Sequence, residues 1–144
     1  MPRVAEPAGR RWGGVAEPHH MPNSVTVVST EDLRPGAVTP GVTRELALEA
    51  GDAIVMRARA EAGATSAWHH HGTRHVLGYV VQGRARFEFG PAGTEAADVE
   101  AGEFFHVPAG LVHRDINPAD GPQEIIMTVV GSGPMVVNVD GPDA

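Results

Sequence analysis

Four of the eight histidines in this 144-residue chain fall between positions 69 and 75. In an extended strand, side chains two residues apart point to the same face and lie about 7 Å from each other. If this stretch is extended, His69 and His71 can therefore bind one metal ion together. His70, between them, would point to the opposite face. His75 has the same parity as His69 and His71 and is a further candidate ligand.

A second concentrated stretch, residues 102–117, contains the histidine that could complete such a site. His113 follows Pro108 and Gly110, which are expected to shape a turn. We predict that the fold brings His113 opposite the first two ligands. His106 enters the same turn from the other side, and we expect it to be a packed or rim histidine that does not bind the metal.

The composition excludes several kinds of chemistry. The chain has no Cys, so it can form no disulfide, bind no metal through a thiolate and use no cysteine nucleophile. All 11 basic residues are Arg, which excludes a lysine Schiff base. A net charge of −7 argues against nucleic acid as a partner, because nucleic-acid affinity depends on basic residues. No apolar run is long enough to span a membrane, and we expect a cytoplasmic protein.

The elements that must position the histidines are predicted to be short strands. The 18 Gly and 12 Pro residues imply frequent turns, and β-branched runs between turns favour an all-β fold. The residues of 42–48 that would share one face are Val42, Arg44, Leu46 and Leu48. Strands are predicted at residues 25–29, 42–48, 53–60, the histidine-rich stretch, 79–83, 84–90, 96–99, 104–107, 112–116, 124–130 and 135–139. This series of short strands is typical of a jelly-roll barrel.

The chain is predicted to form one domain. Residues 1–22 have almost no apolar periodicity and are expected to be a disordered tail, in which His19 and His20 are solvated bystanders. Residues 23–144 are expected to form the folded domain. That length is enough to bury a core without disulfides.

The two histidine-containing stretches, residues 63–83 and 102–117, resemble the two signature motifs of the cupin superfamily. In the second stretch, every fixed position of the motif is matched. In the first, the glycines and the His-x-His pair are matched. The matching residues are Gly63, His69, His71 and Gly83, then Gly102, Pro108, Gly110, His113 and Asn117. The resemblance implies a small single-domain cupin, with a jelly-roll (double-stranded β-helix) barrel that holds a metal site inside.

The first motif departs from the family pattern at its glutamate, and two ways of counting place that position differently. Counting back from Gly83 gives Val76, which cannot bind a metal. Counting forward from His71 gives His75, and strand parity favours this choice unless a bulge at Gly72 or Gly78 intervenes. The predicted metal ligands are therefore His69, His71 and His113, with His75 as the fourth.

A set of neutral imidazole ligands leaves the +2 charge of the ion uncompensated, which favours anionic chelating molecules. Imidazole suits Fe(II), Ni(II), Cu(II) or Zn(II), and the ligand types do not choose among them. The resemblance implies a mononuclear metalloenzyme that acts on a small molecule. Dioxygenase chemistry is the first expectation. The alternatives are isomerase or lyase chemistry, a non-catalytic binding or sensing protein, and a structural cupin. We also expect a homodimer.

Overall fold

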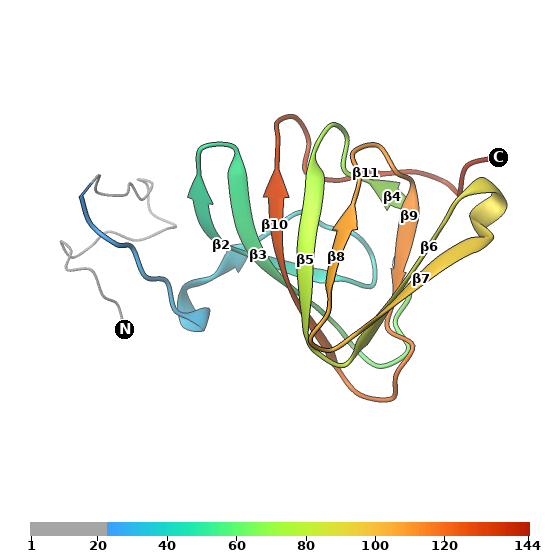
Figure 1. The fold of residues 1–144 in the computed structure, drawn as a ribbon, viewed down its shortest axis with the longest axis horizontal. Helices are drawn as coiled ribbons and strands as arrows, with labels where there is room; N and C mark the ends of the chain where they lie inside the picture. The colour runs from blue at the N-terminus through green and yellow to red at the C-terminus, as the bar shows by residue number, and fades with distance from the viewer. Residues whose placement is uncertain (1–22) are drawn as a thin grey trace.

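The computed structural model describes residues 23–144, and the expected tail at 1–22 lies outside the described residues. Almost all of the regular structure is β-strand, arranged in two antiparallel sheets that face each other (Figure 1), which confirms the all-β jelly-roll prediction. No helix in this part of the chain is long and apolar enough to cross a membrane. The elements are η1 (Thr30–Asp32), β1 (Arg34–Pro35), β2 (Thr43–Ala50), β3 (Ala53–Ala60), β4 (His69–His70), β5 (His75–Gln82), β6 (Arg84–Phe89), η2 (Pro91–Gly93), β7 (Glu95–Glu100), β8 (Phe104–Val107), β9 (His113–Ile116), β10 (Gln123–Val130) and β11 (Val137–Asn138).

Strands that are far apart in the sequence are neighbours in both sheets. The six-stranded sheet has the order β1-β2-β3-β10-β5-β8, and the five-stranded sheet has the order β11-β4-β9-β6-β7. The short strand β4 lies between β11 and β9, where His69 pairs directly with His113. This pairing joins the two sequence motifs across one ladder.

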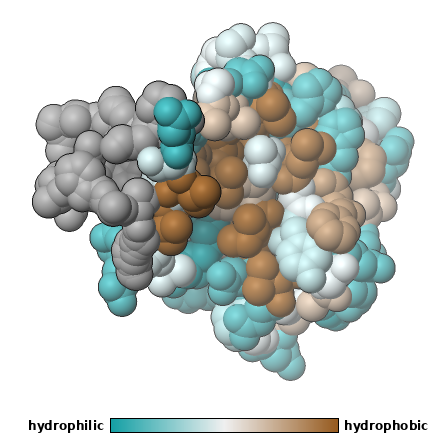
Figure 2. All heavy atoms as spheres, turned by 60° about the vertical axis from the view of Figure 1, so that its left-hand side comes forward, coloured by the Kyte–Doolittle hydropathy of each residue, from teal (hydrophilic) through white to brown (hydrophobic). Residues whose placement is uncertain are grey.

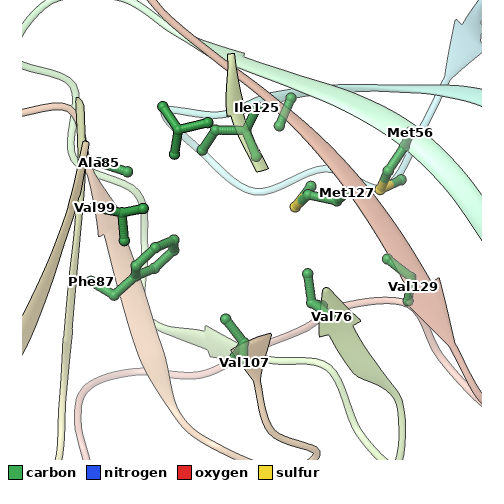
Figure 3. Close-up of a cluster of buried hydrophobic side chains, with 11 residues drawn as sticks. Met56, Val76, Ala85, Phe87, Val99, Val107, Ile125, Met127 and Val129 are labelled. Carbon is green, nitrogen blue, oxygen red and sulfur yellow. The ribbon is translucent and has the colours of Figure 1, made fainter. Parts of the chain in front are cut away.

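The strand alternation expected from the sequence determines which side chains form the core. In β5, Val76, Gly78 and Val80 are buried, whereas Leu77, Tyr79 and Val81 point outward. Side chains from both sheets meet between them (Figure 3). The buried cluster consists of Met56, Ala58, Val76, Val80, Ala85, Phe87, Val99, Val107, Ile125, Met127 and Val129. The barrel is therefore packed with apolar side chains over much of its interior.

The lack of a side chain at Gly78 shapes one wall of this interior. A Cβ atom at Gly78 would overlap the ring of Phe105. The Phe105 ring packs against Phe87, with the ring centroids 4.8 Å apart. The Phe87 ring centroid lies in turn 6.2 Å from that of His113. Glycine at position 78 thus lets an aromatic ring lie directly on the backbone of β5.

One predicted strand is wrong. Residues 25–29 form no strand, and η1 follows them. Val25 and Val27 are 78% and 51% exposed, so the β-branched residues of this segment do not enter the core. Their β propensity has no effect because no described strand pairs with them.

Candidate metal centre

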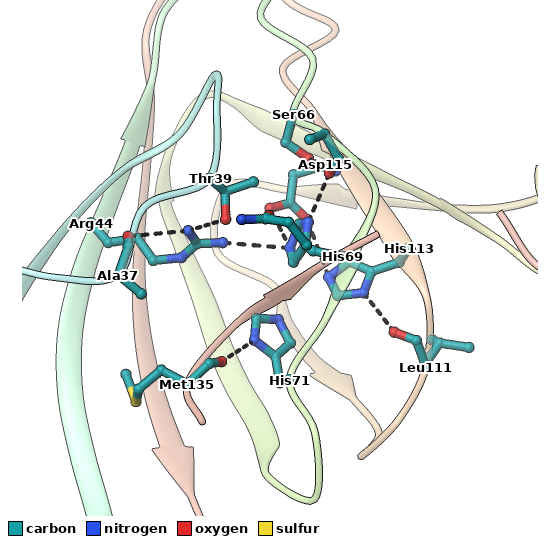
Figure 4. A network of polar contacts seen from close by, with 12 residues as sticks. Ala37, Thr39, Arg44, Ser66, His69, His71, Leu111, His113, Asp115 and Met135 are labelled. Carbon is teal, nitrogen blue, oxygen red and sulfur yellow. Dashed lines mark hydrogen bonds and ion pairs between the residues drawn. The ribbon is translucent and has the colours of Figure 1, made fainter. Parts of the chain in front are cut away.

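Three histidines converge inside the barrel. His69 lies on β4, His71 just beyond its end, and His113 at the start of β9. One ring nitrogen from each lies within 4.8 Å of the other two, and all three side chains are buried. The ring centroid of His69 is 4.4 Å from that of His113 and 5.2 Å from that of His71. Figure 4 shows the three rings directed toward a common region.

Backbone carbonyl groups fix the orientation of all three rings. Nδ1 of His69 contacts the carbonyl oxygen of Ala67 at 2.8 Å, and Nδ1 of His113 contacts that of Leu111 at 2.9 Å. Nδ1 of His71 contacts the carbonyl oxygen of Met135 at 2.9 Å. Because a carbonyl oxygen only accepts hydrogen bonds, each Nδ1 carries the proton. Each neutral ring therefore has the lone pair on Nε2, the atom available to a metal.

The protein keeps at least two of these rings in the uncharged form that binds metals. Burial lowers the pKa of His69 to about 4, although nearby Asp115 opposes the shift. Burial also lowers the pKa of His71 to about 4, and its hydrogen bond to Met135 opposes the shift. Both imidazoles are thus neutral at pH 7 and ready to bind a cation without first losing a proton.

Two charged residues lie beside the histidines, and neither was predicted as a site residue. Arg44, on β2, is 5% exposed, and its Nη2 lies 3.4 Å from Nε2 of His69. Its Nη1 donates to Oγ1 of Thr39 at 2.6 Å, which holds the guanidinium in place. Asp115, on β9, has a carboxylate oxygen 3.6 Å from Nε2 of His69 and another 3.4 Å from Nε2 of His113. Strand parity could have identified both: Arg44 shares a face with apolar residues, and Asp115 lies two residues after His113.

The remaining histidines of the described chain lie outside this cluster. His75 is exposed on β5, and its Nδ1 lies 2.9 Å from Nε2 of the exposed His106. His70 is half-buried, and its Nδ1 accepts a hydrogen bond from the backbone N–H of Gly72. The structure thus brings together three of the four predicted ligands and places His75 on the outer face of the barrel.

The turn between β4 and β5 explains the position of His75. Gly72 has φ +62° and begins a turn, so parity counted from His71 does not continue into β5. Val76, next to His75, points inward and is 1% exposed. Counting back from Gly83 therefore identifies the inward position of the first motif, and an apolar side chain occupies it.

Asn117, the asparagine of the second motif, is buried away from the histidine cluster. Its Nδ2 donates to the carbonyl oxygens of Ala60, Glu61 and Gly121 at 3.3, 3.0 and 2.9 Å. Its Oδ1 accepts a hydrogen bond from the backbone N–H of Ala119. Asn117 therefore ties the loops after β3 and β9 together and leaves the metal chemistry to His113.

The space beside the histidines is small and mixed in character. The cavity has a volume of about 20 Å³, enough for roughly one water molecule. The polar groups in its lining are Arg44, His71, His113, Asp115 and Gln123, and the apolar ones include Val42, Val76, Phe87 and Phe105. Apolar walls with a few convergent polar groups are the lining of a small-molecule site, but a space of this volume admits a larger molecule only if side chains move. The three nitrogen donors, each with its Nδ1 bonded behind it, fit a divalent transition metal.

Comparisons with known proteins agree with this architecture. No curated protein matches the chain. Among solved structures, a Klebsiella pneumoniae protein with a double-stranded beta-helix domain shares 22% identity at a TM-score of 0.61, covering 76% of this chain and 92% of that chain. A polyketide cyclase from Streptomyces resistomycificus shares 18% identity at a TM-score of 0.65, with coverage of 80% and 85%.

A larger relative in fold is the oxalate decarboxylase from Bacillus subtilis. It shares 21% identity at a TM-score of 0.61, and the match covers 71% of this chain but only 28% of that chain. At such identities the likeness to these structures shows the fold alone. The sequence match is more specific, because the family model of the cupin domain spans residues 56–131, which include the three clustered histidines. The chain therefore belongs to the cupin family.

Proposed function

We propose that this chain is a mononuclear metal-dependent cupin that binds a small anionic or chelating molecule in the barrel and oxidises it as a dioxygenase, an oxidoreductase that adds both atoms of dioxygen to its substrate. The observation that carries the proposal is the set of three buried histidines whose Nδ1 atoms are bonded to carbonyl oxygens and whose rings each bring one nitrogen within 4.8 Å of the other two. A divalent metal, when bound, would supply a Lewis acid for an anionic oxygen donor and, if redox-active, a route for electrons to dioxygen.

Arg44 supports an anionic ligand. Its guanidinium is buried beside His69 and within the wall of the cavity. Burial lowers the pKa of Arg44, while Asp115 opposes the shift, but an arginine remains charged at neutral pH. This fixed positive charge can hold a carboxylate or enolate through charge-assisted hydrogen bonds. The apolar walls lower the effective dielectric constant of the same space and so strengthen the attraction.

The proposal is tested by metal analysis and dioxygen uptake. Protein purified without an affinity tag would be stripped and reloaded separately with Fe(II), Ni(II), Cu(II) or Zn(II). Mn(II) joins the series because the oxalate decarboxylase with the similar fold has Mn(II) centres. We expect one metal near one equivalent per chain, and dioxygen uptake with a redox-active ion when small dicarboxylates or enolisable diketones are added. Failure to bind metal or any such ligand would contradict the proposal.

Arg44→Met separates anion recognition from metal binding. We expect affinity for an anionic ligand to fall by about 10- to 100-fold, because hydrogen bonds to charged groups contribute about 1.5–3 kcal/mol. The readout is ligand titration of the metal-loaded protein by calorimetry, with metal content measured in parallel. Arg84→Met is the matched control, since Arg84 lies on β6 and pairs with Glu100 at the surface. Equal losses in both variants would remove the specific role of Arg44.

The alternative functions give different results in the same assay. Tight binding without any product would indicate a sensing or storage protein. A product formed without dioxygen uptake would indicate isomerase or lyase chemistry. Asp115 beside the histidines supports isomerase or lyase chemistry, because these reactions need a positioned acid or base.

We also propose that the chain forms a homodimer through the outer face of the six-stranded sheet. Ile126, Tyr79 and Phe104 are aligned across β10, β5 and β8, and the rings of Tyr79 and Phe104 lie 4.6 Å apart. All three are exposed, as are Leu77 and Val81. Figure 2 shows hydrophobic side chains gathered on the face seen from the side of β2 and β3. A contiguous apolar patch of this kind marks an interaction surface, and a twofold dimer covers such a patch with its own copy.

Phe104→Glu tests the dimer. Phe104 is 78% exposed, so we expect the folded chain to tolerate the change and the dimer to dissociate to a monomer in analytical ultracentrifugation. Val38→Glu is the control, because Val38 is equally exposed at 77% but lies outside this sheet face. A monomeric wild-type chain at all concentrations would contradict the proposal. The cytoplasmic location stays a prediction.

A further inference from the structure

The carboxylate of Asp115 is directed at the histidine cluster without a hydrogen-bond partner for one of its oxygens. Its backbone is fixed to Ser66 by two hydrogen bonds of 2.8 Å, from Ser66 N to Asp115 O and from Asp115 N to Ser66 Oγ. The side chain points to the same interior as His113, two residues earlier on β9. Oδ1 is buried and, within the described residues, has no hydrogen-bond partner. A buried carboxylate oxygen left in this state is costly unless a cation completes it.

The neighbouring histidine nitrogens do not provide a donor for this carboxylate. The Nδ1 atoms of His69 and His113 each contact a backbone carbonyl oxygen, so the neutral rings have their lone pairs on Nε2. Arg44 confirms this for His69, because a guanidinium only donates hydrogen bonds and its Nη2 faces Nε2 at 3.4 Å. Asp115 therefore adds a negative oxygen to a region where nitrogen lone pairs already converge. Such an arrangement is repulsive by itself and becomes favourable around a shared cation.

The spacing between Asp115 and two of the three histidines agrees with a common ion. Nitrogen and oxygen ligands lie about 2.0–2.2 Å from a divalent ion, so two ligands at a tetrahedral angle are about 3.4 Å apart. The carboxylate oxygens of Asp115 lie 3.4 Å from Nε2 of His113 and 3.6 Å from Nε2 of His69. One carboxylate oxygen thus lies near Nε2 of His113 and the other near Nε2 of His69. Asp115 lies outside the group of histidine nitrogens that are all within 4.8 Å of one another, so its side chain must move toward His71 when the ion binds.

We propose that Asp115 is the fourth protein ligand of the metal, and that it supplies from β9 the carboxylate that Val76 cannot supply from β5. The proposal rests on the metal site proposed above. It replaces the neutral four-histidine site expected from the sequence with three imidazoles and one carboxylate. The formal charge of a divalent ion with its ligands is then +1, and the nearby Arg44 adds a second positive group for an anionic ligand.

Metal titration of the full chain tests this proposal without an activity assay. Co(II) and Zn(II) are the probes, with dissociation constants obtained by competition against a chromophoric chelator. We expect Asp115→Asn and Asp115→Ala each to weaken binding by at least about 10-fold, since even groups behind a ligand contribute 10- to 100-fold. The visible absorption bands of bound Co(II) should also change in position or intensity, because they report the ligand set. Asp98→Asn is the matched control, as Asp98 pairs with Arg86 at the surface of β7.

A compensating variant distinguishes loss of a ligand from loss of structure. Val76→Glu combined with Asp115→Ala moves a carboxylate to the opposite wall, and we expect it to recover part of the Co(II) affinity that Asp115→Ala loses. Unchanged affinity and an unchanged Co(II) spectrum in Asp115→Asn would overturn the assignment while the three-histidine site stands. Wild-type protein that binds neither ion would instead contradict the metal site itself. Urea unfolding of each variant confirms that the compared proteins are folded.

Discussion

Replacing His113 with alanine is expected to remove most of the metal bound by the chain. His113 is 1% exposed, and one of its ring nitrogens lies among the ligand atoms that are within 4.8 Å of one another. Loss of one of three imidazole ligands should weaken binding by more than about 100-fold, since removal of an outer hydrogen-bond partner alone costs 10- to 100-fold. His69→Ala and His71→Ala should behave alike. The measurement is metal content after dialysis, together with a competition titration.

The chain contains its own control for this experiment. His106→Ala also removes an imidazole, but from the exposed pair with His75 on the outer face. His70→Ala removes one from between the two ligands. Both should retain the metal. If either variant lost as much metal as His113→Ala, the ligands would lie on a different face from the one the structure indicates.

Val76→Glu is expected to have the second large effect, a loss of stability that is much larger in the metal-free than in the metal-loaded protein. Val76 is 1% exposed, so a buried carboxylate without a partner should destabilise the metal-free chain by about 3–5 kcal/mol. Bound metal should offset much of this cost, because the carboxylate then faces a cation. The readout is the free energy of unfolding in urea, measured with and without Zn(II). Anionic ligands should bind the loaded variant more weakly, because the added negative charge opposes them.

His75→Glu is the matched control for this prediction. The two positions are adjacent, but His75 is exposed on the outer face of β5. The substitution should therefore leave both metal affinity and the effect of metal on stability unchanged. Tighter metal binding by His75→Glu, with no change in Val76→Glu, would mean that His75 points into the barrel and Val76 points outward.

The sequence predicted the architecture well where periodicity and turn residues act locally. The strand at 53–60 has the bounds of β3, and the strand at 104–107 has those of β8. Both alternate inward and outward side chains between clear turn signals. The segment 25–29 is richer in β-branched residues than either strand but forms no strand, because strand formation depends on a pairing partner that composition does not reveal.

Within the candidate site, parity worked inside single strands and failed across a turn. His69 and His71 are both in the cluster, two residues apart, as alternation predicts. His75 is not in the cluster, because the turn at Gly72 interrupts the alternation and the next strand begins with His75 pointing outward. Asp115 was within reach of the same reasoning, since it lies two residues after His113. Its contact with the histidines depends on the pairing of β4 with β9, which only the fold establishes.

The bare backbone at Gly78 determines how wide a ligand the barrel admits. The Phe105 ring lies on that glycine and also forms part of the cavity wall. Any side chain at position 78 would drive the ring toward Phe87, and through it toward His113. A smaller residue at position 105 would instead enlarge the cavity at this wall and leave the metal-binding nitrogen atoms in place. In laboratory evolution toward bulkier ligands, Phe105 is therefore the position to randomise, and Gly78 the one to keep fixed.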